Sequence, residues 1–144
     1  MALPQKNLYD NYKLTDINTA NQGKLIVMLY DGAIKFLNIA LEHMDIKTYD
    51  IVNNNLLKTQ DIITELLLSL NMKEGGEISE NLFNLYLYFK RRLLEANVQK
   101  DPAIIEEVLN HLKELRYAWN KISAQGTATD KTNINKKGSF SIEG

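Results

Sequence analysis

The sequence has no cysteine, two prolines and no long apolar run. Without cysteine the chain forms no disulfide, thiolate metal site or cysteine nucleophile, a composition typical of a reducing compartment. The longest apolar run, from Leu25 to Tyr30, is six residues, whereas a helix that spans a bilayer needs about 20. The opening residues, MALPQKN, lack the apolar segment of a secretory signal peptide. We therefore expect a cytoplasmic protein that does not insert into a membrane.

The sequence also lacks an excess of charge of either sign, because 17 Lys and Arg face 18 Asp and Glu. Such a balance gives little attraction for a nucleic acid, so nucleic-acid binding is not expected. No glycine-rich phosphate loop, zinc-binding histidine pair or nucleophile elbow is present. His43 and His111 do not supply the paired Glu-x-x-His elements of a di-iron bundle. The prediction is a protein that is not an enzyme and has no cofactor and no metal site.

Long proline-free stretches with apolar residues every three to four positions predict an all-α chain. We expect helices at about residues 21–44, 48–71, 77–98 and 102–123. Asp101 before Pro102 is typical of a helix start, and Gly75-Gly76 is the clearest turn. Because the connections are short, sequential helices should pack antiparallel. The predicted fold is an up-down-up-down four-helix bundle over residues 19–125.

Both ends of the chain are expected to lie outside the bundle. Gly126 is expected to end the last helix. Residues 126–144 are polar and hold too few large apolar side chains to offset the entropy of ordering, so we predict a flexible tail. Residues 1–18 contain Tyr9 and Tyr12 among several apolar side chains. We interpret them as a lid that competes with a partner for the bundle surface.

The second and third predicted helices carry more apolar surface than one buried face requires. Extra positions lie beside the core stripe of each helix when residues are placed at intervals of about 100°. They are Leu57 and Leu68 in the second helix and Phe83, Leu87 and Leu94 in the third. If the two strips meet, they form an exposed apolar groove of the kind that marks a partner site. Lys90 falls inside the apolar arc, where its ammonium group can reach a partner's carboxylate.

Two other arrangements would cover the same strips. The chain's own N-terminal segment could lie over them, or a second copy could pair with them in a homodimer. A self-associating helical bundle with a structural or interaction role is therefore the alternative to partner binding.

Several stretches of the sequence match a known pattern. They are Tyr9 and Tyr12, TANQGKLIVMLYDGAIKFL at 19–37, LLSLNMKEGGEISENLFNLYLYFKRRLLEAN at 67–97, and LKELRYAWNKI at 112–122. With these stretches the chain resembles the FliS family of flagellar secretion chaperones. It departs from the family at Asn21-Gln22, where the family usually has Ser-Pro.

The resemblance implies a cytosolic antiparallel four-helix bundle that binds the C-terminal segment of flagellin. It further implies that the chaperone prevents premature polymerisation and delivers flagellin to the gate of the flagellar type III export apparatus. The N-terminal segment is then expected to occupy the groove when flagellin is absent. From helical spacing we expect apolar partner contacts at Leu57, Leu68, Phe83, Leu87 and Leu94, a charge contact at Lys90, and lid contacts at Tyr9 and Tyr12.

Overall fold

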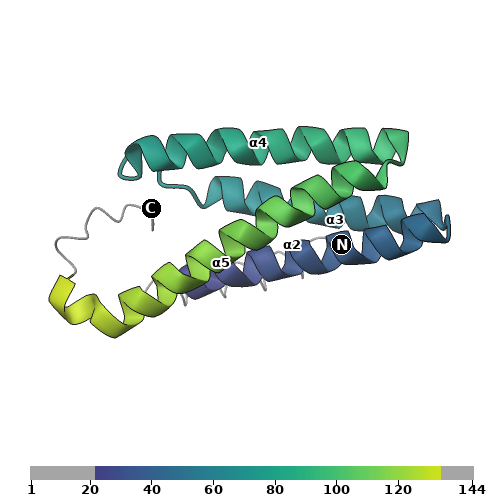
Figure 1. Cartoon of the computed structure of the whole chain (residues 1–144). Helices are drawn as coiled ribbons and strands as arrows, with labels where there is room; N and C mark the ends of the chain where they lie inside the picture. Colours follow the sequence, from purple (N-terminus) through teal and green to yellow (C-terminus); the bar gives the residue numbers. More distant parts are fainter. Residues whose placement is uncertain (1–21, 134–144) are drawn as a thin grey trace, which may run out of the picture.

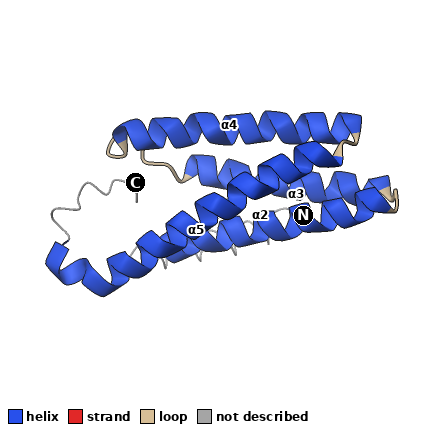
Figure 2. Cartoon of the chain, in the orientation of Figure 1, coloured by secondary structure: helices blue, strands red, loops and turns tan. Residues whose placement is uncertain are grey.

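The computed structural model describes residues 22–133, with side chains described as far as residue 124. Within this part of the chain every regular element is a helix (Figure 2). The helices are α2 (Gln22–Asp45), α3 (Tyr49–Leu68), α4 (Gly76–Gln99) and α5 (Pro102–Asn133). The first three agree with the predicted helices to within a few residues at each end.

The helices pack in a closed ring, so that each packs mainly against two others. α2 packs against α3 and α5, and α4 packs against the same two helices from the other side (Figure 1). Short connections reverse the chain between successive helices, so neighbours run antiparallel. The predicted all-α four-helix bundle is confirmed, with α2 and α4 placed diagonally.

The core fills the space between the four helices. Its largest fully buried side chains include Tyr30, Leu37, Leu56, Ile63, Leu66, Tyr86, Phe89, Leu93, Ile105 and Leu112. Helical spacing predicts a core stripe on the second helix at Val52, Leu56, Ile63, Leu67 and Leu70. This prediction is wrong in part, because Leu66 is fully buried whereas Leu67 and Leu70 are only partly buried. The buried face of α3 is rotated from the predicted one toward polar positions.

Two polar side chains, Asn55 and Thr59, lie on this buried face. Asn55 Nδ2 donates a hydrogen bond to the Ile51 carbonyl at 2.9 Å, and Thr59 Oγ1 donates to the Asn55 carbonyl at 2.9 Å. Each side chain thus bonds to the preceding turn of its own helix. Because these donors are paired within the helix, α3 can turn both residues inward at a low cost.

The turn between α3 and α4 depends on the two predicted glycines. Gly76 has a φ of +55°, which glycine adopts without strain. At Gly75 an added Cβ would lie 1.7 Å from Ser79 Oγ and 2.7 Å from the Asn71 carbonyl oxygen. That oxygen accepts hydrogen bonds from the Gly75 amide at 2.7 Å and from Ser79 Oγ at 3.0 Å. The prediction of a turn at this glycine pair is confirmed.

The last helix begins as predicted but ends later. Asp101 Oδ1 accepts a hydrogen bond from the Ala103 amide at 3.0 Å, with Pro102 as the first helical residue. The predicted end near Ser123 is wrong, since α5 continues through Gly126 to Asn133 and extends beyond the other helices (Figure 1). A helical Gly costs only about 1 kcal/mol relative to Ala, and no Pro follows. The rest of the predicted tail, residues 134–144, lies outside the described residues.

Candidate functional site

A row of apolar side chains on α4 faces solvent. Phe83 is 37% exposed, Leu87 is 40% exposed and Leu94 is 58% exposed. Their spacing of four and seven residues places them on one side of the helix. The other side of α4 carries the buried residues Tyr86, Phe89 and Leu93. The exposed second strip that helical spacing predicts for this helix is present.

A corresponding row lies on α3. Leu57 is 50% exposed and Leu68 is 69% exposed, and Thr64 lies half-buried between them on the same side of the helix. Both leucines stand away from the buried face of α3, as predicted.

Two polar contacts cross the seam between α3 and α4. Lys90 Nζ donates to Thr64 Oγ1 at 2.6 Å and to the Gln60 carbonyl oxygen at 3.3 Å. Asn97 Nδ2 donates to Asn53 Oδ1 at 2.5 Å. These contacts fix the register of the two antiparallel helices. They also show that, on each helix, the side that contacts the other helix lies next to the exposed apolar row.

This register brings the two apolar rows onto one surface. Leu94 lies at the level of Leu57, and Phe83 lies at the level of Leu68, with the Lys90 contact between these levels. We call this surface the α3/α4 face. Its exposed apolar residues are Leu57, Leu68, Phe83, Leu87 and Leu94.

Lys90 lies within the face, as predicted, but its ammonium group is directed at α3. Its hydrogen-bond acceptors, Thr64 and Gln60, were not predicted, because the contact depends on how two helices pair. The ion pairs within 4.0 Å that the described residues form are Arg92–Glu95, Arg92–Glu107 and Arg116–Asp31. The charge of Lys90 therefore meets neutral oxygen atoms in this part of the chain.

The structure extends the face beyond the predicted residues. Val98 is 78% exposed and follows Leu94 by one helical turn on α4, so the same spacing rule would have found it. The predicted lid residues, Tyr9 and Tyr12, lie outside the described residues, so their role stays a prediction.

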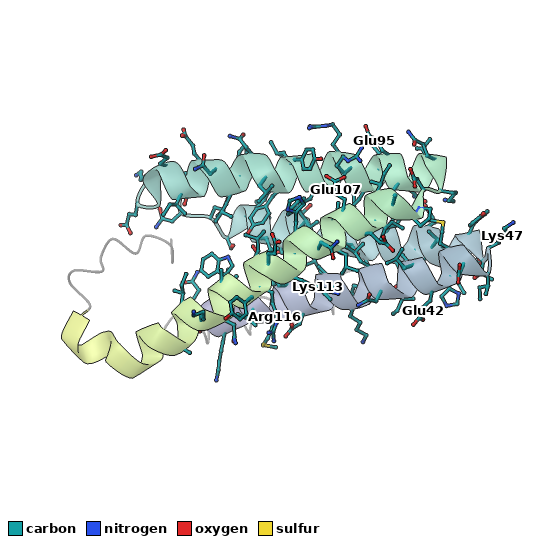
Figure 3. The ribbon with its side chains drawn as sticks, in the orientation of Figure 1. Glu42, Lys47, Glu95, Glu107, Lys113 and Arg116 are labelled. Atoms are coloured by element: carbon teal, nitrogen blue, oxygen red, sulfur yellow. The ribbon has the colours of Figure 1, made fainter. Side chains whose placement is uncertain are left out.

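A charged network holds the opposite edge of α4 to α5. Arg92 Nη2 lies 2.8 Å from Glu107 Oε1, and Arg92 also pairs with Glu95. Figure 3 labels these two acidic partners, Glu95 on α4 and Glu107 on α5. Tyr88 donates a hydrogen bond to Glu107. This bond, helped by Arg92, lowers the pKa of Glu107 despite partial burial, and it raises the pKa of Tyr88. The network fixes α4 so that its apolar row points outward.

The chemistry of the α3/α4 face is that of a binding surface. It offers apolar side chains around one cation, a combination that suits an amphipathic segment. Among the described residues, no three His, Asp or Glu side chains are grouped so as to hold a metal ion. In the same residues, no helix combines the length and apolar character needed to cross a membrane.

Comparison with known proteins identifies the family. The sequence pattern of the family described as flagellar protein FliS matches residues 5–126. The chain belongs to the FliS family. It is 35% identical to the flagellar secretion chaperone FliS of Bacillus subtilis, over 81% of this chain and 86% of the relative. It is 38% identical to the FliS chaperone of Salmonella typhimurium, over 77% of this chain and 83% of the relative.

A third relative gives the same result. The flagellar secretion chaperone FliS of Vibrio cholerae is 31% identical over 75% of this chain and 79% of the relative. The resemblance inferred from the sequence motifs is thus confirmed. Because these FliS relatives are chaperones, the prediction that the chain is not an enzyme is confirmed as well.

Proposed function

We propose that this FliS-family chaperone binds the C-terminal segment of flagellin on its α3/α4 face in the cytoplasm. Binding would prevent premature polymerisation, and the complex would be delivered to the gate of the flagellar type III export apparatus. The observation that carries the proposal is the pair of adjoining apolar rows on α3 and α4. Their side chains are 37% to 69% exposed. The names of the FliS relatives support the role in flagellar export.

The bound segment would lie along the face as an amphipathic helix. From Leu57 to Leu68 the row on α3 runs for about 16 Å at ~1.5 Å per residue, which corresponds to about three helical turns. Each well-buried Leu or Phe contributes about 1.5 to 3 kcal/mol to binding. Part of this gain is lost in ordering a segment that is disordered alone. The face is therefore long enough for helix-in-groove recognition.

Residues 1–18 are proposed to cover the same face when flagellin is absent. Tyr9 and Tyr12 would then bury their rings against it and leave when flagellin binds. Replacing both tyrosines by Asp should tighten flagellin binding, because the competing contact is weakened. Unchanged affinity would exclude a lid role for these tyrosines.

Calorimetric titration with a peptide of the C-terminal segment of the organism's own flagellin, at two temperatures, tests the function. We expect one-to-one binding with a negative heat-capacity change, the mark of apolar burial. Absence of heat and of co-elution at high micromolar concentration would contradict the proposal. Sedimentation over a range of concentrations would then reveal whether the face instead pairs two copies of the chain.

A further inference from the structure

Lys90 places a positive charge in the middle of the α3/α4 face. Its half-buried side chain donates to Thr64 Oγ1 at 2.6 Å and to the Gln60 carbonyl oxygen at 3.3 Å. An ammonium group has three donors. No carboxylate of the described residues lies within 4.0 Å of it, and the exposed Asp61 next to Gln60 forms no ion pair with it. A cation in such a position is stabilised when an anion joins it.

Apolar side chains flank this cation along α4. Leu87 lies one helical turn before Lys90, and Leu94 lies one turn after it. Both leucines are exposed, at 40% and 58%. The face therefore has an apolar patch on each side of a central positive charge.

Two other cations near the face contact aromatic rings and not the seam between α3 and α4. The Lys58 ammonium lies 5.3 Å from the centre of the Phe36 ring on α2. The Arg91 guanidinium lies 5.5 Å from the centre of the Tyr88 ring, on the side of α4 that adjoins α5. Lys90 is thus the cation that lies between the two apolar rows, because its ammonium group is held against α3.

We propose that Lys90 is a specificity-determining residue that selects a bound helix with an acidic side chain between two apolar ones. The inference rests on the proposed function, because it places a flagellin helix on the face. The apolar residues of that helix, about one turn on either side of the acid, contact the patches at Leu87 and Leu94. Since Thr64 and Gln60 already hold the Lys90 side chain in place, little of its freedom is lost on binding.

The probe is the same flagellin peptide, titrated against the full chain at two salt concentrations. Lys90→Met keeps most of the stem and removes the charge, and Arg91→Met is the matched control on the neighbouring position. We expect Lys90→Met to weaken binding about tenfold and to reduce its salt dependence. Arg91→Met should change neither. A Lys90→Met protein with a lower melting temperature but unchanged affinity and salt dependence would overturn the inference, because Lys90 would then have a structural role alone.

Replacing each acidic residue of the peptide by its amide locates the contact. One replacement should weaken binding to the wild type about tenfold and have no further effect on Lys90→Met. If every amide replacement weakened binding to the wild type and to Lys90→Met by the same factor, the role of Lys90 would be overturned and the proposed function would stay intact. Failure of the wild type to bind the peptide would instead overturn the proposed function.

A second copy of the chain is the remaining rival, because α3 carries a similar pattern, with Leu57 one helical turn before the acidic Asp61 and Leu68 two turns after it. Sedimentation of the wild type and of Asp61→Asn tests it. Self-association that Asp61→Asn abolishes would overturn the inference in favour of a homodimer. A wild type that stays monomeric at the concentrations of the titration supports it.

Discussion

The hydroxyl groups of Tyr30 and Tyr86 lie 2.5 Å apart in the centre of the bundle. Tyr30 belongs to α2 and Tyr86 to α4, the two helices that lie diagonally across the core. Their exposed fractions are 0% and 1%. The pair therefore joins two helices that share little other contact. By holding Tyr86 inward it also fixes the side of α4 that faces solvent, on which the apolar row lies.

The hydroxyl pair should be visible in the free energy of unfolding. Tyr86→Phe leaves the Tyr30 hydroxyl in the core without this partner, so we expect a loss of about 1 to 3 kcal/mol. The double variant Tyr30→Phe, Tyr86→Phe should lose less than the sum of the two single changes, because no hydroxyl then lacks its partner. Urea denaturation of the four proteins measures the coupling. Strict additivity would mean that the two hydroxyls do not stabilise each other.

The same pair predicts a loss of stability in alkaline solution. Burial raises the pKa of Tyr86 to about 12, and it raises the pKa of Tyr30 well above its ordinary value. Because both folded pKa values exceed the unfolded value of about 10, the contribution to stability is complete below pH ~10. It falls as the pH rises toward the folded values. The urea midpoints of unfolding at about pH 9 and about pH 11 should therefore differ less from each other in the double Phe variant than in the wild type.

The exposed row on α4 could be predicted from the sequence, whereas the core face of α3 could be predicted only in part. Helix geometry fixes the angle between Phe83 and Leu93, so one being exposed and the other buried follows from spacing. On α3, a prediction from apolar spacing assigns the polar residues Asn55 and Thr59 to the surface. Their bonds to carbonyls of their own helix make them compatible with the core. Such internal pairing is not visible in an apolar pattern.

Contacts between helices were beyond the reach of the sequence. The Lys90 contact with Thr64 depends on the register and rotation of α3 against α4, which the pattern of a single helix does not contain. The predicted end of α5 is wrong for a related reason. Gly126 is compatible with either a helix end or a helix interior, and the difference between them is only about 1 kcal/mol.

Phe83 offers the most direct test of the α3/α4 face. Phe83→Asp should weaken binding of the flagellin peptide at least tenfold, roughly the loss of one buried aromatic contact, and leave the melting temperature nearly unchanged. Tyr117→Asp is the matched control, because Tyr117 is also an exposed aromatic, at 65%, but lies on α5. It should bind normally.

The same experiment needs a core variant to check the rotation of α4. Leu93 is 0% exposed, so Leu93→Asp buries an unpaired carboxylate and should unfold the bundle. Circular dichroism during heating measures the melting temperatures of both variants. A large drop in melting temperature for Phe83→Asp, or a stable Leu93→Asp protein, would contradict the outward orientation of the row.

Lys47 predicts a gain of stability rather than a loss. It follows α2 with a φ of 59°, and its amide bonds to the Met44 carbonyl at 3.2 Å while the Thr48 amide bonds to the His43 carbonyl at 2.9 Å. This helix-end motif favours glycine. Lys47→Gly should therefore raise the free energy of unfolding by about 0.5 to 1 kcal/mol in urea denaturation, since glycine removes the strain but is freer in the unfolded chain. Lys47→Ala keeps the strained φ and should give no gain; an equal gain from alanine would assign the effect to the lysine charge.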